Sequence, residues 1–155
     1  MFYAFYEAQN STLPLSKTPL LIWLSGGPGS SSMINNLIAV GPWLVTESIT
    51  TLEPNPGAWN NLFGLLFLDN PIGTGFSIAS SPQEIPTDQE GIAEHLYVAI
   101  TRFLRLDPVY KHRPIYIIGQ SYGGKYPPPT ANYILKRNAE LHPSQRVNLL
   151  GVVIG

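Results

Sequence analysis

The residue best suited to covalent chemistry is Ser121, at the centre of the pattern G-x-S-x-G formed by residues 119–123. An apolar run over residues 115–118 precedes it, and a segment that can form a helix follows it. In such a strand–turn–helix context a serine is pushed out of a tight turn as a nucleophile, and the glycines are needed because backbones crowd the turn. The pentapeptide also occurs by chance, so the rest of the sequence has to support this interpretation.

A catalytic serine needs a base that takes its proton and donors that face the oxyanion it creates. The amide of Tyr122, directly after the serine, can supply one donor. The segment Gly26-Gly27-Pro28-Gly29 follows a different apolar run and can supply the second, because glycine lets bare backbone approach a substrate. The alternative is that these glycines only form a tight turn between a strand and a helix.

Candidates for the base and the acid are scarce. After Ser121 the chain has no aspartate and a single glutamate, Glu140. Three histidines occur, each in a context typical of a surface or boundary residue: His95, His142 and His112. The last is part of Lys111-His112-Arg113, which is expected to form a surface turn before a strand. Asp69 follows an apolar run and can orient a loop. The sequence therefore predicts a nucleophile without a local proton acceptor.

Composition limits the partners. The net charge is −1 and no basic block occurs, so nucleic acid is not an expected partner. Hydrophobic residues make up 44% and charged residues 12%, so the chain should bury much of itself or belong to something larger. The absence of cysteine excludes disulfides and thiolate metal sites. No apolar run approaches membrane-spanning length, and no signal-peptide pattern is visible.

Alternating buried strands and amphipathic helices indicate an α/β domain with a mostly parallel sheet. Apolar runs predict strands at six places: residues 2–8, 20–24, 43–45, 65–68, 115–118 and 147–154. Glu53 and its neighbours up to residue 57 are expected to form a loop.

Three helices are expected. Serines at 30–32 can cap a short helix over residues 33–38. The spacing of Thr87 and Glu90 predicts a capping box at the start of a longer helix that Asp107-Pro108 ends. Three prolines at 127–129 predict a break before a helix over residues 130–137.

Three blocks of the sequence resemble the serine carboxypeptidase family, and its plant carboxypeptidase-like branch in particular. Residues 23–32, W-L-S-G-G-P-G-S-S-S, resemble the family's W-L-N-G-G-P-G-C-S-S. Trp59-Asn60 and residues 67–77 resemble its next block, and residues 119–126 resemble its G-E-S-Y-A-G-x-Y nucleophile block. The order and spacing agree from about residue 2 to residue 155.

The resemblance implies a partial α/β-hydrolase fold with Ser121 as nucleophile and the amides of Gly27 and Tyr122 as the oxyanion hole. It implies hydrolysis that releases a residue from a peptide's free C-terminus through an acyl-enzyme, without cofactor or metal, in a vacuole, lysosome or secretory space. The family places the triad aspartate and histidine far downstream of the serine. We therefore expect residues 1–155 to be a single incomplete domain, truncated at both ends, lacking the C-terminal strands and cap, and inactive alone.

The chain departs from the family where the substrate's terminal carboxylate is recognised. The family uses the asparagine after W-L, a glutamate in the next helix and the glutamate before the nucleophile; here those positions hold Ser25, Ala39 and Gln120. Trp23 remains as an apolar wall, and Gly26 is also expected to contact substrate. Because a carboxyl group that binds a carboxylate must be protonated, the neutral amide of Gln120 predicts a loss of acid preference.

Two other functions fit the same sequence. The family's acyltransferase branch also departs at the carboxylate-recognition positions, so acyl transfer from an ester donor is one alternative. The second is a non-catalytic binding or decoy domain that uses the same pocket.

Overall fold

The structure is a computed structural model that describes residues 1–46, 48 and 50–155. Its strands are β1 (Tyr3–Tyr6), β2 (Leu20–Leu24), β3 (Trp43–Val45), β4 (Leu52–Pro54), β5 (Gly64–Leu68), β6 (Ile115–Gly119) and β7 (Leu149–Ile154). Its α-helices are α1 (Ser32–Asn35), α2 (Gln89–Leu104) and α3 (Pro127–Glu140). Three shorter helical turns are used below: η2 (Asn36–Val40), η5 (Ser121–Lys125) and η6 (Pro143–Gln145).

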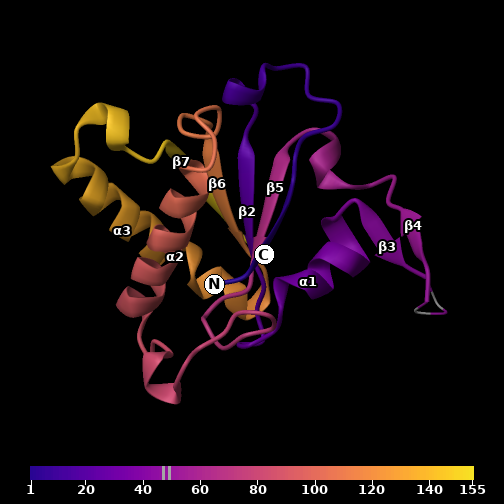
Figure 1. Cartoon of the computed structure of the whole chain (residues 1–155), viewed down its shortest axis with the longest axis horizontal. Helices are drawn as coiled ribbons and strands as arrows, with labels where there is room; N and C mark the ends of the chain where they lie inside the picture. The colour runs from indigo at the N-terminus through magenta and orange to yellow at the C-terminus, as the bar shows by residue number, and fades with distance from the viewer. Residues whose placement is uncertain (47, 49) are drawn as a thin grey trace.

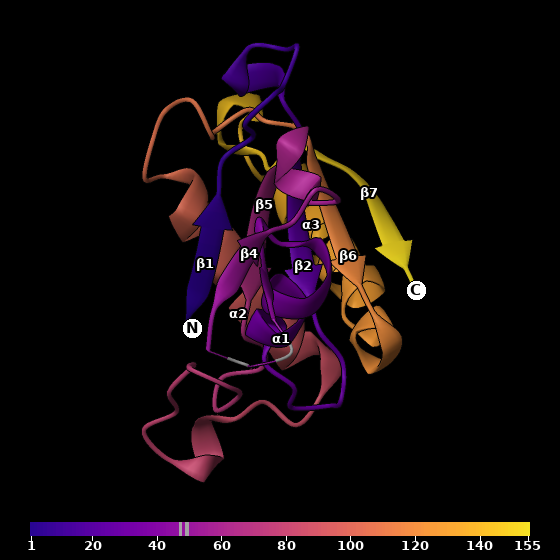
Figure 2. The same ribbon diagram turned by 90° about the vertical axis from the view of Figure 1, so that its right-hand side faces the viewer.

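A five-stranded sheet in the order β1-β5-β2-β6-β7 forms the centre of the molecule (Figure 1). β5, β2, β6 and β7 are parallel, and β1 joins β5 antiparallel at one edge. β1 and β7 therefore form the two edges of this sheet (Figure 2). The predicted mostly parallel sheet is confirmed.

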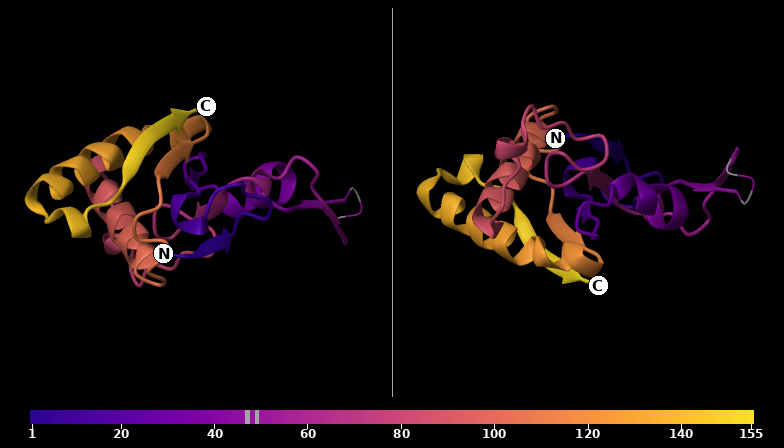
Figure 3. Two further views of the ribbon diagram at one scale, coloured as in Figure 1. Left: turned by 90° about the horizontal axis from the view of Figure 1, so that it is seen from above. Right: turned by 90° about the horizontal axis from the view of Figure 1, so that it is seen from below.

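The two faces of the sheet are covered differently. α2 and α3 lie against one face, and α1 with the β3–β4 hairpin extends from the other (Figure 3). In β2, Leu20, Ile22 and Leu24 belong to the core under α2 and α3, while Leu21 and Trp23 belong to the core of the opposite face. This alternation follows the two-residue period of a strand, and burial on both faces explains the unbroken apolar run.

Helix α2 begins one residue later than the capping box predicts. Its N-cap is Asp88, whose carboxylate accepts a hydrogen bond from the amide of Gly91 at 2.8 Å. The predicted pairing of Thr87 with Glu90 is therefore wrong, because aspartate serves as N-cap in its place. The helix also ends at Leu104, before the predicted stop.

Helix α3 runs without a break from Pro127 to Glu140, so the predicted break at the prolines, before a helix over residues 130–137, is wrong. The three prolines occupy the first turn, where the amides of a helix have no partner four residues earlier. The first such bond comes from Thr130, whose amide donates to the carbonyl of Tyr126 at 3.2 Å. The prolines therefore remove no hydrogen bond from the helix, although each lacks a backbone N–H.

Two other expectations need correction. Leu52–Pro54 is a strand that pairs antiparallel with β3, whereas the sequence predicts a loop from Glu53 to residue 57. Arg113, predicted in a surface turn with Lys111 and His112, is fully buried. Its guanidinium binds both carboxylate oxygens of Glu7 at 2.8 and 2.9 Å and donates to the carbonyl of Thr18 at 2.8 Å. It thus joins the segments that precede β2 and β6 to the end of β1.

Candidate active site

Ser121 lies at the end of β6, at the first position of η5, as a nucleophile turn requires. Its φ is +57°, and no other non-glycine residue in the described part of the chain has a positive φ. Such a conformation is costly for a residue with a side chain and marks positions where function demands it. Ser121 is exposed, and its backbone amide donates a hydrogen bond to the carbonyl of Gly155 at 2.6 Å.

The glycines on either side of the serine are required by packing. A Cβ atom on Gly119 would overlap the carbonyl of Gly123, and a Cβ on Gly123 would overlap the carbonyl of Leu24 at the end of β2. The turn is therefore packed both against itself and against the neighbouring strand. This crowding gives the G-x-S-x-G pattern a physical reason in this chain.

The glycine-rich segment after β2 lies directly beside the serine turn. A Cβ on Gly26 would stand 2.8 Å from the carbonyl oxygen of Gln120 and 2.8 Å from the amide nitrogen of Tyr122. Gly27 has a φ of +107°, which favours glycine. Neither the Gly27 amide nor the Tyr122 amide donates a hydrogen bond to another described residue. Two unpaired N–H groups thus lie on the two segments that meet at the serine.

Asp69 anchors the glycine-rich segment. It is fully buried, and its carboxylate accepts hydrogen bonds from the hydroxyl of Ser31 at 2.8 Å and from the amides of Ser32 at 2.7 Å and Phe76 at 2.9 Å. Ser31 also caps α1, as expected of this serine run. The carboxylate therefore binds the start of α1 to the loop that follows β5, and it orients loops rather than acting on Ser121.

Ser25 belongs to a buried chain of hydrogen bonds. Its hydroxyl accepts from the indole N–H of Trp23 at 3.2 Å and donates to the amide oxygen of Asn35 at 2.7 Å. The sequence analysis does not identify Asn35. It compares only Ala39 with the family's helix position, and Ala39 is exposed in the structure. The one available signal was a polar residue on the inward side of a helix capped by serines. The side chain of Gln120 is exposed beside Ser121.

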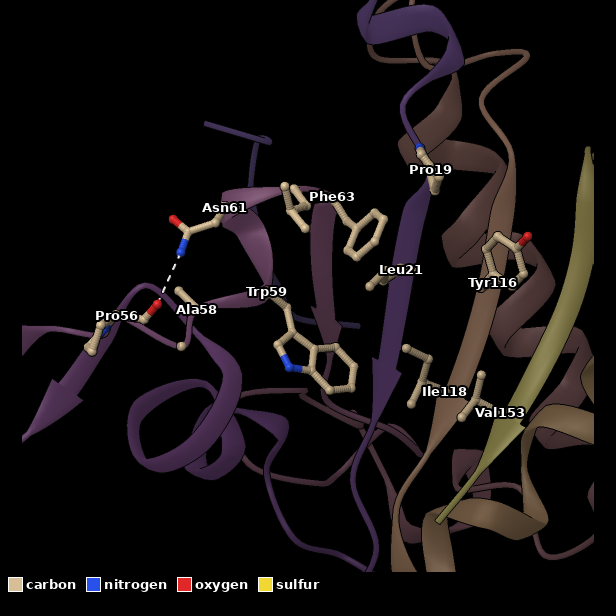
Figure 4. Close-up of a pocket in the computed structure, with 12 residues that line it drawn as sticks. Pro19, Leu21, Pro56, Ala58, Trp59, Asn61, Phe63, Tyr116, Ile118 and Val153 are labelled. Atoms are coloured by element: carbon tan, nitrogen blue, oxygen red, sulfur yellow. Dashed lines mark hydrogen bonds between the residues drawn. The ribbon is translucent and has the colours of Figure 1, made fainter. Parts of the chain in front are cut away.

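Trp23 is buried, and its ring packs edge-on against Trp59 with centroids 5.5 Å apart. Beyond Trp59 the sheet face opens into an apolar cavity of about 660 Å³ (Figure 4). Leu21 and Ile118 line it from β2 and β6, and Val153 lines it from β7. The cavity lies on the same face of the sheet as Trp23, which shares a buried cluster with Leu21 and Ile118.

No histidine bonds to the serine. The Nδ1 of His142 lies 2.9 Å from the hydroxyl of Ser144, and His112 lies exposed before β6. His95 lies on α2, with its Nδ1 buried and unpaired among the described residues. Within residues 1–46, 48 and 50–155, the Ser121 hydroxyl makes no hydrogen bond to any base.

Two tyrosines, Tyr122 and Tyr126, follow Ser121. Burial, and then the neighbouring Tyr122, raise the pKa of the Tyr126 phenol above its usual value. The Lys125 ammonium lies 4.9 Å from the centroid of the Tyr122 ring.

In the described residues no three or more histidine, aspartate or glutamate side chains are grouped so that they could hold a metal ion. None of the described helices is both long and apolar enough to cross a membrane.

A parallel sheet flanked by helices, with an exposed serine in a strained turn after a central strand, defines an α/β hydrolase fold. The sequence profile described as serine carboxypeptidase matches residues 1–155, and the chain belongs to this family. Serine carboxypeptidase-like 50 of Arabidopsis thaliana is 59% identical over 155 residues, covering 100% of this chain and 34% of its own length. The probable serine carboxypeptidase CPVL of Homo sapiens is 35% identical, covering 100% of this chain and 31% of its own.

A solved structure agrees. The fold matches the crystal structure of Kex1(delta)p, a prohormone-processing carboxypeptidase from Saccharomyces cerevisiae, with a TM-score of 0.84 and 33% identity. That match covers 99% of this chain and 33% of the yeast chain. The chain thus spans about a third of the length of the relatives it matches.

Proposed function

We propose that Ser121 is the nucleophile of a serine carboxypeptidase-like hydrolase, and that the amides of Gly27 and Tyr122 form its oxyanion hole. One observation carries this proposal: Ser121 alone among the described non-glycine residues has a positive φ, and it lies beside two unpaired amides. Preformed donors of this kind stabilise the charge that develops in acyl transfer. Residues 1–155 then supply the nucleophile part of one α/β-hydrolase domain.

The reaction follows from these groups. The Ser121 oxygen attacks the carbonyl carbon of the scissile bond while its proton passes to a base. The carbonyl oxygen becomes an oxyanion that accepts hydrogen bonds from the two amides. Collapse of this intermediate expels the C-terminal residue as the leaving amine, which takes up a proton, and water then releases the acyl group from the serine. The base and its acid partner lie outside residues 1–155 in this proposal, because no local histidine bonds to the serine.

The proposed substrate is the free C-terminus of a peptide, in a vacuolar, lysosomal or secretory compartment. Gln120 is exposed beside Ser121 and offers a neutral hydrogen-bonding group to the terminal carboxylate. The Ser25 hydroxyl is also neutral, but it donates to Asn35 and must give up that bond before it can donate to a substrate. A missing charged partner at Ala39 weakens that binding by roughly 1–3 kcal/mol. These neutral groups also favour the runner-up, an acyltransferase that takes an ester donor without a terminal carboxylate.

A chimera tests the function. The 155 residues replace the matching segment of the 59%-identical Arabidopsis relative, and the purified protein is assayed on a blocked dipeptide and on a glucose ester. Release of the dipeptide's C-terminal residue, abolished by Ser121→Ala, is the expected result. Acyl transfer from the ester without peptide hydrolysis would establish the acyltransferase in its place.

The isolated chain provides a separate test of the missing base. A fluorophosphonate probe labels serines that a base activates, so labelling of Ser121 is expected to be no faster than that of an ordinary surface serine. Rapid labelling that Ser121→Ala removes would contradict the absence of a local base. If the chimera is also inactive on both substrates, the remaining candidate is a non-catalytic binding domain.

A further inference from the structure

A second cavity lies far along the sheet from the serine. It has a volume of about 700 Å³ and opens where the C-terminal ends of α2 and α3 meet η6. Its lining includes the segments that lead into β6 and β7, so it lies at the end of the sheet where the parallel strands begin (Figure 1). Ser121 follows the opposite end of β6. The cavity is therefore separate from the candidate active site.

The lining of this cavity is strongly cationic. Four of the chain's nine lysine and arginine residues line it: Arg105, Lys111, Arg137 and Arg146. They come from four different segments, namely the end of α2, the turn before β6, the last turn of α3 and the residue after η6. Because the whole chain carries a net charge of −1, this concentration is local. We call these four side chains the basic cluster.

Most of this charge is not neutralised. Arg137 pairs with Glu140 at 3.2 Å, and both side chains are largely exposed. The Nε of Arg146 donates to the carbonyl of Leu141 at 3.0 Å, which leaves its terminal nitrogens available. Arg105 and Lys111 form no side-chain hydrogen bond or ion pair with any described residue.

One nearby acid remains to be considered. The carboxylate of Asp107, which lies between Arg105 and Pro108 in the chain, accepts a hydrogen bond from the amide of Val109 at 2.8 Å. Together, the Asp107 and Glu140 carboxylates neutralise at most two of the four positive charges of the basic cluster. An excess of positive charge therefore faces the cavity.

Helix dipoles explain only part of this arrangement. A cation near a helix C-terminus is stabilised by the partial negative charge there, which accounts for Arg105 and Arg137. Arg146 gains part of the same stabilisation, because its Nε donates to Leu141, the C-cap of α3. Lys111 lies in the turn before β6 and caps no helix. The helix ends alone therefore do not explain why all four cations line one cavity.

The most buried lining residues form an apolar floor, and Thr101 and Gln145 add two neutral polar groups to the lining. Leu104 and Val147 are buried there, and Tyr97, Pro108 and Leu141 add apolar surface. The ring of Tyr97 also contacts Tyr133 of α3, with centroids 5.4 Å apart, so α2 and α3 hold the floor together. An apolar floor under a cationic rim suits a ligand with an apolar body and an anionic group.

We propose that this cavity binds a phosphate ester with an aromatic or apolar body. Arginine forks bind phosphate oxygens with two parallel hydrogen bonds, and lysine adds a point charge. A phosphate monoester carries close to two negative charges at neutral pH, which matches the excess of the basic cluster. The body of the ester lies on the floor formed by Leu104 and Val147.

Calorimetric titration of the 155-residue chain with phenyl phosphate tests the proposal, with phenyl sulfate and benzyl alcohol as comparison probes. Phenyl phosphate is expected to bind at least roughly tenfold more tightly than phenyl sulfate, because it carries the second negative charge. Benzyl alcohol, which is neutral, is expected not to bind. A rise in NaCl from about 20 mM to about 200 mM should weaken phenyl phosphate binding several-fold by screening.

Two matched double variants locate the site. R105Q/K111Q removes two charges of the basic cluster and should weaken phenyl phosphate binding about tenfold or more. R102Q/K136Q removes the same charges from outside this cavity, on α2 and α3, and should leave affinity within about twofold. All four side chains point to the surface, and circular dichroism verifies that both variants fold.

Several results would overturn the proposal. Absence of phenyl phosphate binding would refute the site directly. Equal losses in the two double variants would show that only the overall charge matters. Equal affinity for phenyl sulfate would remove the assignment to phosphate esters. Affinity for benzyl alcohol equal to that for phenyl phosphate would show that the cavity binds apolar groups and that the basic cluster plays no part. None of these measurements depends on the activity of Ser121.

Discussion

At the scale of single residues, the candidate site depends on side chains that never reach a substrate. Asp69 illustrates this, because its buried carboxylate satisfies one hydroxyl and two amides from segments on either side of β5. A carboxylate can accept all of these bonds at once. An asparagine would accept on one oxygen only and would turn a second donor toward the existing N–H groups.

Asp69→Asn is therefore expected to lower the free energy of unfolding by about 2–3 kcal/mol, since hydrogen bonds to a buried charge are lost. Urea denaturation followed by circular dichroism measures the change. The control is Asp107→Asn, whose residue is exposed and accepts a single bond from Val109. Equal changes in the free energy of unfolding of the two variants would show that burial does not strengthen the hydrogen bonds of Asp69.

Gln120 sets the expected pH dependence. Its amide donates at every pH, whereas a glutamate there would bind a carboxylate only when protonated. In the chimera, peptide hydrolysis should therefore not rise toward about pH 4–5, and Gln120→Glu should restore that rise, because the glutamate carboxyl gains its proton in this range. A pH–rate profile of both proteins measures the difference. A profile that already rises toward acid with Gln120 in place would refute this role.

At the scale of elements, position within a helix decides whether proline is tolerated. Pro128 lies in the first turn of α3, and Leu135 lies in its middle with an exposed side chain. Pro128→Ala should change the free energy of unfolding by less than about 1 kcal/mol, because no helical hydrogen bond is gained or lost. Leu135→Pro should cost about 3 kcal/mol or more. Thermal denaturation compares them, and similar costs at both positions would contradict the uninterrupted helix.

A partly buried ion pair joins the end of β1 to the segment before β6. Glu7, just past β1, neutralises the fully buried Arg113. Glu7→Gln leaves that guanidinium uncompensated and should destabilise the chain by about 3 kcal/mol. Glu53→Gln, at an exposed position of β4, is the matched control and should have little effect. Denaturant midpoints give the comparison, and an unchanged midpoint for Glu7→Gln would mean that solvent, rather than Glu7, stabilises the arginine.

The same elements show how far the sequence alone leads. Strands β2, β5 and β6 are buried on both faces, so their continuous apolar runs predicted them correctly. The G-x-S-x-G pattern likewise located the turn at Ser121, because crowding leaves room only for glycine beside it. Predictions from the sequence failed where tertiary contacts determine burial. Arg113 has the sequence context of a surface residue, but it is buried because Glu7, which is distant in the sequence, pairs with it. Asn35 escaped notice because its partner, Ser25, is brought to it only by the fold.

At the scale of the whole molecule, one side of the sheet remains open. The outer strand β7 has four exposed apolar residues: Leu150, Val152, Val153 and Ile154. Val153 also lines the apolar cavity beside Trp59 (Figure 4). An edge strand with an apolar face of this kind promotes association with other chains. The isolated 155-residue chain should therefore self-associate or bind hydrophobic dyes.

Val153→Lys is expected to reduce the fluorescence of an apolar dye bound to the chain and to shift sedimentation toward the monomer, because it places a charge in the open cavity. Ile78→Lys, in a loop and 84% exposed, adds the same charge elsewhere and should change neither. A monodisperse wild-type chain with a cooperative melt and no dye binding would contradict this expectation. It would favour the non-catalytic binding domain over a part of an enzyme.

The buried carboxylate of Asp69 has a mechanical consequence. Since one side chain holds both Ser32 at the start of α1 and Phe76 in the loop after β5, a displacement of either segment is passed to the other. Substitutions in the loop after β5 should therefore also shift the glycine-rich segment that precedes α1, although they lie far from Ser121 in the sequence.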